Sequence, residues 1–147
     1  MKVRRPFLLW MMCFIYLLAA AAELLQAVGV VAQWNILLAV DYQPGPLYPL
    51  FFTAFFFLLF FVSALLLWLR TYWAPEFAGT AALFFAVWFW IDKFFVAVNP
   101  QPFSDQVFNL IVCIVVLTLV LVSMHALKPF MKQPRVTIGG TDEQGSP

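Results

Sequence analysis

The sequence predicts an all-α membrane protein, with four transmembrane helices in an antiparallel bundle, from its composition and from the lengths of its apolar segments. The 147 residues are 65% hydrophobic and 10% charged, whereas soluble domains have roughly 45–50% apolar and 25% charged residues. Four segments each hold at least ~20 mostly apolar residues, enough to cross a ~30 Å hydrocarbon core as a helix. Helices are required because an open strand edge in lipid would leave backbone groups unpaired.

The predicted spans belong to one transmembrane domain, residues 1–127. In order, they are residues 7–31, 47–69, 77–98 and 107–127. Residues 33–40 are ambiguous, since they could extend the first span or lie in the outer interface. Pro75 suits the first turn of the third span, where its missing N–H is not needed. Residues 128–147 are rich in Pro, Gly and polar residues, so we expect a flexible cytoplasmic tail.

The basic residues predict the orientation of the spans. Seven of the eight Lys and Arg residues lie before the first span, between the second and third, or after the fourth: Lys2, Arg4, Arg5, Arg70, Lys128, Lys132 and Arg135. The eighth, Lys93, lies inside the third span. The positive-inside rule then places both termini in the cytoplasm of a multi-pass protein of the cytoplasmic membrane.

The amino terminus has a second interpretation. Basic residues 2–5, an apolar core and the alanines of residues 19–22 also fit a signal peptide with its cleavage site. Against this, the apolar run continues past Glu23 to Val31, which is longer than a signal core. We therefore expect the segment to be retained. Cleavage would leave three spans and an outside amino terminus.

Polar residues inside the spans predict a polar layer across the bundle. Counted from the cytoplasmic ends at ~1.5 Å per residue, they fall at nearly one depth in the outer half of the membrane, with Gln26 slightly further out. The candidate site residues are Glu23, Gln26, Thr53, Asp92, Lys93 and Asn109.

Glu23 and Lys93 each share a helix face with a row of alanines, and small residues mark close helix contacts in membranes. Glu23 and Lys93 should therefore point inward, while the large Phe side chains face lipid. An unpaired charge near the centre of a span costs about 2.5–3.5 kcal/mol on insertion scales, so we hypothesise a Glu23–Lys93 contact. Asp92 would be a second partner of Lys93 or a group near the outer surface. Asn109 and Thr53 could complete the hydrogen bonding.

The polar layer has three interpretations. The first is a structural clamp that fixes helix packing, because buried pairs can serve specificity without activity. The second is a site for an ion, a proton or a polar ligand that is reached from outside. The third applies to Asp92 and Lys93 alone, whose side chains could extend towards the headgroups.

The remaining reactive residues predict no enzyme, cofactor or metal. Cys13 and Cys113 are ~12 Å apart in depth at 1.5 Å per residue, too far for a disulfide between straight spans. A lone histidine, His125, cannot supply both axial haem ligands. No phosphate loop, zinc spacing or Ser-His-Asp set is visible. The net charge of +1 gives no indication of a nucleic-acid partner.

Two resemblances add to this interpretation. Residues 15–23, Ile-Tyr-Leu-Leu-Ala-Ala-Ala-Ala-Glu, resemble the first span of small multidrug resistance transporters, whose membrane glutamate exchanges protons for cationic drugs. This resemblance implies a proton- and substrate-binding role for Glu23, but the glycine-rich patterns of that family's later spans are missing. Residues 70–75 and 88–93 are similar to small four-span bacterial membrane proteins of uncharacterised function. That similarity implies an architecture and a bacterial cytoplasmic membrane, and no activity.

Taken together, these features favour a non-enzymatic accessory or interaction subunit. Its expected partners are the lipid bilayer and other membrane protein subunits or a second copy of the chain. The alternative is a small proton- or ion-coupled transporter that uses the polar layer. Water access distinguishes the two, because a structural clamp should be dry and a carrier site should titrate.

Overall fold

The computed structural model describes residues 7–39, 45–96 and 103–131. These residues form helices, with a short turn at residues 70–73, and no strand occurs among them. The elements are α1 (Phe7–Ala32), α2 (Trp34–Ala39), α3 (Leu47–Leu69), α4 (Ala74–Ile91), the π-helix η1 (Asp92–Val96), α5 (Phe103–Leu127) and the 3-10 helix η2 (Lys128–Phe130). Helices α1, α3, α4 with the start of η1, and α5 are each long and apolar enough to cross a membrane.

The helix boundaries agree with the predicted spans in the middle of the chain and differ at several ends. Helix α3 has the predicted limits, and residues 34–39 form a separate short helix rather than an extension of α1. Helix α4 begins three residues earlier than predicted, because Pro75 occupies its first turn and is compatible with helical geometry there. Helix α5 begins at Phe103 rather than at residue 107. The sequence also predicts an outer turn at residues 99–104. Residues 97–102 lie outside the described part of the chain, and Phe103 and Ser104 belong to α5.

A π-helix continues α4 at Asp92–Val96. Its hydrogen bonds reach one residue farther than those of an α-helix, so each turn is wider. The inward face predicted for Lys93 assumed a constant rotation of 100° per residue. That rotation does not continue through η1, so the alanine-rich face of α4 does not extend unchanged to Lys93.

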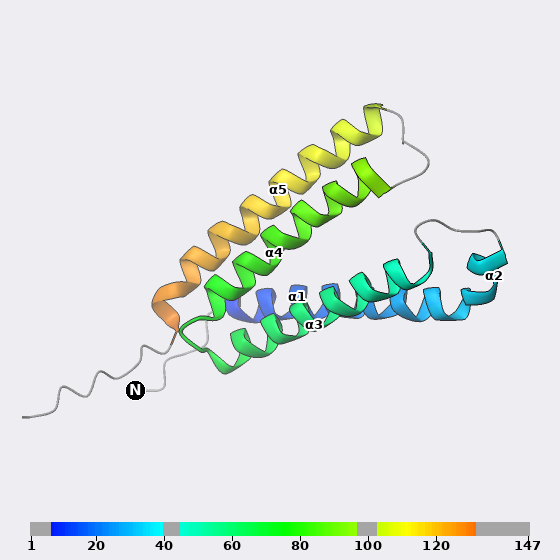
Figure 1. Cartoon of the computed structure of the whole chain (residues 1–147). Helices are drawn as coiled ribbons and strands as arrows, with labels where there is room; N and C mark the ends of the chain where they lie inside the picture. Colours follow the sequence, from blue (N-terminus) through cyan, green and yellow to red (C-terminus); the bar gives the residue numbers. More distant parts are fainter. Residues whose placement is uncertain (1–6, 40–44, 97–102, 132–147) are drawn as a thin grey trace, which may run out of the picture.

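The long helices form two pairs. Helix α1 lies beside α3, and α4 lies beside α5. The pairs meet where α3 leads into α4, which we call the narrow end, and they diverge towards their other ends (Figure 1).

Apolar packing closes the narrow end. Leu67 of α3 and Leu127 of α5 are both fully buried there. Arg70, whose φ of 56° is left-handed, donates a hydrogen bond from its guanidinium to the carbonyl of Phe130. Glu76 and Lys128 form an ion pair of 3.1 Å, but both side chains are about half exposed. Exposed pairs contribute only ~0–1 kcal/mol, so the buried leucines contribute more than this pair to stability at the narrow end.

The first residues of the predicted tail pack against the helices. Lys128–Phe130 form η2, and Met131 is 5% exposed. The packed helical region therefore extends past the predicted limit at residue 127. Residues 132–147 lie outside the described part of the chain.

Aromatic rings fill the contact between α3 and α4, which corrects the expectation that the large Phe side chains face lipid. Phe56 and Phe60 are only 3% and 5% exposed. The Phe85 ring meets both edge-on, with centroids 5.0 and 5.2 Å away. Edge-to-face pairs are worth about 0.5–1.5 kcal/mol beyond their burial, and membrane helices associate through such packing. Other Phe side chains, such as Phe51, are exposed as predicted.

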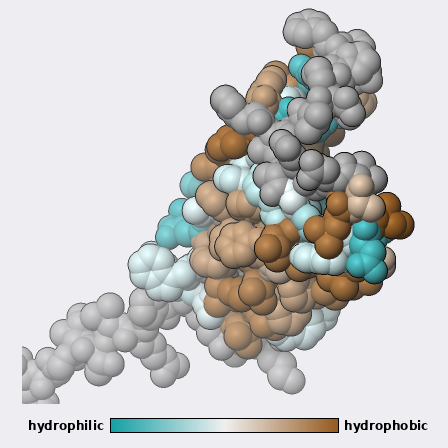
Figure 2. Space-filling view, turned by 45° about the vertical axis from the view of Figure 1, so that its right-hand side comes forward, coloured by the Kyte–Doolittle hydropathy of each residue, from teal (hydrophilic) through white to brown (hydrophobic). Residues whose placement is uncertain are grey.

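The exterior of the described helices is largely apolar, as Figure 2 shows for one face. Helix α5 is the most exposed of the long helices. Only 6% of its most apolar 18-residue window is buried, compared with 28–33% in the other three. It packs against α4 at Gly79, where an added Cβ would lie 3.4 Å from the Leu121 side chain, an ordinary van der Waals distance.

Candidate functional site

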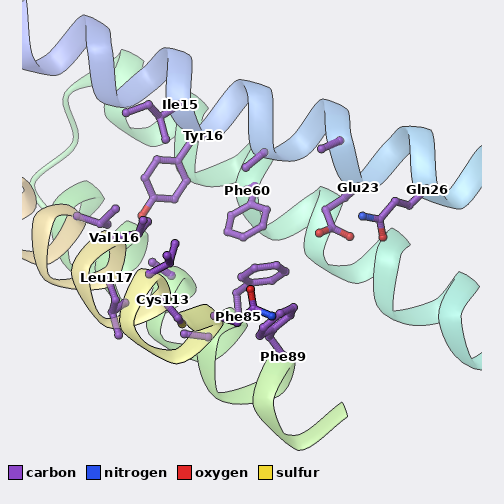
Figure 3. A pocket seen from close by; sticks show the side chains of 17 residues that line it. Ile15, Tyr16, Glu23, Gln26, Phe60, Phe85, Phe89, Cys113, Val116 and Leu117 are labelled. Carbon is purple, nitrogen blue, oxygen red and sulfur yellow. The ribbon is translucent and has the colours of Figure 1, made fainter. Parts of the chain in front are cut away.

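A cavity of about 520 Å³ lies where the two helix pairs diverge, and Figure 3 shows its interior. Helices α1, α4 and α5 form its walls, and Phe60 of α3 also lines it. Its volume lies within the range of about 300–1,000 Å³ that is usual for small-molecule sites. Three of the six predicted site residues, Glu23, Gln26 and Asn109, line this cavity.

Glu23 is the charged residue of the cavity wall. Its side chain is 8% exposed, which confirms the prediction that it points inward. Figure 3 shows its carboxylate directed into the cavity, on the same side of α1 as the Gln26 amide. Among the described residues, no cation or hydrogen-bond donor contacts this carboxylate. A buried carboxylate without such a partner is costly, so the cavity is suited to a ligand that supplies one.

The middle of the cavity is aromatic. Phe60, Phe85 and Phe89 lie between the two helix pairs (Figure 3). The faces of aromatic rings attract cations, by about 0.5–1 kcal/mol at exposed sites and more when water is excluded. A ligand in this cavity would therefore meet a polar group at Glu23 and apolar surface along the rest of its length.

Tyr16 bounds the cavity on the side of the narrow end, and the sequence analysis did not identify it. Its hydroxyl donates a hydrogen bond of 2.6 Å to the carbonyl of Ala78, and its side chain is 3% exposed. This bond joins α1 to α4. The available sequence signal was the spacing from Tyr16 to Glu23, because residues seven apart lie on the same face of a helix.

The other predicted residues do not line the cavity. The hydroxyl of Thr53 donates to carbonyls of its own helix, at 2.8 Å to Pro49 and 3.1 Å to Leu50. Asp92 accepts a hydrogen bond of 2.8 Å from the hydroxyl of Tyr48. These contacts divide the predicted polar layer into separate sites, because residues at one depth can point in different directions around their helices.

The predicted contact between Glu23 and Lys93 is not formed among the described residues. The Lys93 ammonium lies 5.0 Å from the centroid of the Phe89 ring, and no cation contacts Glu23 in the described part of the chain. Lys93 belongs to the π-helix, whose wider turns alter the direction of its side chain. A structural clamp formed by this pair is therefore absent from the described residues.

The other side chains of chemical interest are potential metal ligands and the cysteines. In the described ranges, no three His, Cys, Asp or Glu side chains come together in a way that could hold a metal ion. Neither Cys13 nor Cys113 forms a disulfide within the described residues, and Cys113 lines the cavity from α5. Comparisons with known protein families, curated proteins and solved structures find no match to this chain.

Proposed function

We propose that the chain is a four-span protein of a bacterial cytoplasmic membrane, with antiparallel spans and both termini in the cytoplasm. Four helices of sufficient length and apolarity support this topology. The rings of Trp10 and Trp68 lie 4.7 Å apart, which puts the start of α1 beside the end of α3. Arg70 and Lys128 lie at the same narrow end, as the positive-inside rule requires of a cytoplasmic end.

Reporter fusions test this topology. A green fluorescent protein fused after residue 147 should fluoresce, and alkaline phosphatase fused there should be inactive. Alkaline phosphatase fused after Gly45, in the first predicted outer loop, should be active. The reverse pattern would contradict the proposed orientation.

Within this topology, the protein acts as a non-enzymatic binder or carrier of an amphipathic ligand with a cationic group. One observation carries this proposal: the Glu23 carboxylate is 8% exposed and faces a cavity with otherwise mostly apolar walls. A ligand ammonium would neutralise Glu23, and the amides of Gln26 and Asn109 could contact the polar groups around it. The Phe rings and aliphatic side chains would contact the ligand's apolar part. This corresponds to the transporter alternative, in which ligand binding is the first step.

The substitution Glu23→Gln tests the ligand site while keeping the side chain's size. We expect the affinity for tritiated dodecylammonium to fall about 10- to 100-fold, because a hydrogen bond to a charged group is worth about 1.5–3 kcal/mol. Binding is measured by filtration of proteoliposomes, after subtraction of the uptake by protein-free liposomes.

The matched control is Glu76→Gln, since Glu76 is 48% exposed and pairs with Lys128 away from the cavity. This variant should bind as the wild type does. Equal affinities of wild type, Glu23→Gln and Glu76→Gln would refute a ligand site at Glu23.

The role of an accessory or interaction subunit is the second candidate. The exposed surface of α5 favours it, since only 6% of the most apolar window of that helix is buried. A partner helix could pack on this surface. Intact-mass measurement of the protein purified from its native membrane in mild detergent tests this role, and a stoichiometric second protein would support it.

A further inference from the structure

The α4–α5 pair has a second hollow on the side away from α1. It is a groove of about 370 Å³, lined by apolar residues of both helices. Leu83 of α4 and Ile114 of α5, two of its lining residues, are 47% and 55% exposed. In a four-span protein, this surface faces the hydrocarbon of the bilayer.

The groove and the Glu23 cavity share part of their walls. Ala86, Cys113 and Leu117 line both, so a layer one side chain thick separates them, and two of its three side chains are small. We call these three residues the seam. Towards the narrow end, the helices come together at Gly79 and Leu121. The seam lies farther along the pair, beside the cavity.

We propose that the ligand is a membrane-dissolved amphiphile that reaches Glu23 from the bilayer, across the seam between α4 and α5. This inference rests on the proposed ligand site and specifies its substrate class. The lining of the cavity favours an amphiphile, because it is mostly apolar and holds one carboxylate, Glu23, without a partner among the described residues. A hydrocarbon chain can remain in contact with apolar surface from the groove to the cavity. Its cationic head then meets Glu23, the group that lacks a partner among the described residues.

Filling the groove should slow ligand exchange without changing affinity. Ile114 lines the groove but not the cavity, so Ile114→Trp obstructs the route and leaves the binding site intact. We expect bound tritiated dodecylammonium to exchange about tenfold more slowly against unlabelled excess, the effect of an added barrier of ~1.4 kcal/mol. Its equilibrium dissociation constant should be unchanged. Leu83→Trp, on the α4 side of the groove, should act in the same way and provides a second variant if Ile114→Trp fails to fold.

Val115→Trp is the matched control, because Val115 is 51% exposed on the same helix and lines neither hollow. It should exchange the probe at the wild-type rate. If both groove variants also exchange at that rate while wild type binds, the ligand site stands and the route across the seam is overturned. If wild-type protein takes up no more dodecylammonium than protein-free liposomes, the ligand site fails, and the route fails with it.

Discussion

Replacing Phe60 with alanine is expected to lower the free energy of unfolding by about 3 kcal/mol, the lower end of the 3–5 kcal/mol usual for buried Phe→Ala changes. Phe60 is 5% exposed, and its ring lies 5.9 Å from that of Tyr16 on α1 and 5.2 Å from that of Phe85 on α4. It therefore joins three helices. The lower end applies because an unfolded chain within the membrane is also surrounded by apolar groups, so the cost comes from lost packing rather than from transfer out of water.

Titration with sodium dodecyl sulfate from mild-detergent micelles measures this loss. The control is the adjacent Phe61→Ala, since the Phe61 ring is 38% exposed and stacks on Phe57 of the same helix, with centroids 5.8 Å apart. The control should lose no more than ~0.5 kcal/mol, as is usual for surface positions. Similar losses in the two variants would show that Phe60 does not belong to a packed core.

The helices were largely predictable because their signal is local. Continuous apolar runs of sufficient length are interrupted by Pro, Arg or polar turns, and this pattern gave the limits of α3 at residues 47 and 69. The inward direction of Glu23 was predictable for a related reason. A charged residue inside a span is too costly to expose to lipid, and the alanines on its face marked the side on which another helix approaches.

The aromatic core was not predictable in the same way. In a soluble protein, a core Phe is surrounded by apolar groups and a surface Phe by water. In a membrane, both are surrounded by apolar groups. Phe60 and Phe61 are adjacent and identical in type, yet one is buried and the other is partly exposed. Only the rotation of α3 relative to its neighbours distinguishes them, and that rotation depends on contacts across the whole molecule.

The polar layer failed as a prediction for a similar reason. The depth of a residue along its helix follows directly from its number. The direction of its side chain also depends on the rotation of the helix and on local backbone geometry. The Thr53 hydroxyl donates hydrogen bonds to its own backbone. Lys93 lies in a π-helix that periodicity could not reveal. Glu23, Gln26 and Asn109 share a cavity because of how far the helix pairs diverge, a property of tertiary packing.

Replacing Ala78 with phenylalanine should separate α1 from α4 near the narrow end. Ala78 is fully buried, and its carbonyl accepts the Tyr16 hydrogen bond. Overpacking costs about 1–3 kcal/mol, and loss of the hydrogen bond adds about 1 kcal/mol. We therefore expect the free energy of unfolding to fall by about 2–4 kcal/mol. Ala54→Phe, at an exposed position on α3, is the matched control and should change it little.

The same variant tests whether packing at the narrow end sets the geometry of the ligand site. Ala78 does not line the cavity, so its replacement can affect ligand binding only by changing how α1 lies against α4. Under conditions where Ala78→Phe remains folded, its affinity for dodecylammonium should fall while that of Ala54→Phe does not. Unchanged affinity in a destabilised Ala78→Phe would show that Glu23 binds its ligand independently of this contact. Loss of both stability and affinity would mean that the Tyr16–Ala78 contact sets the distance between Glu23 on α1 and the facing helices α4 and α5.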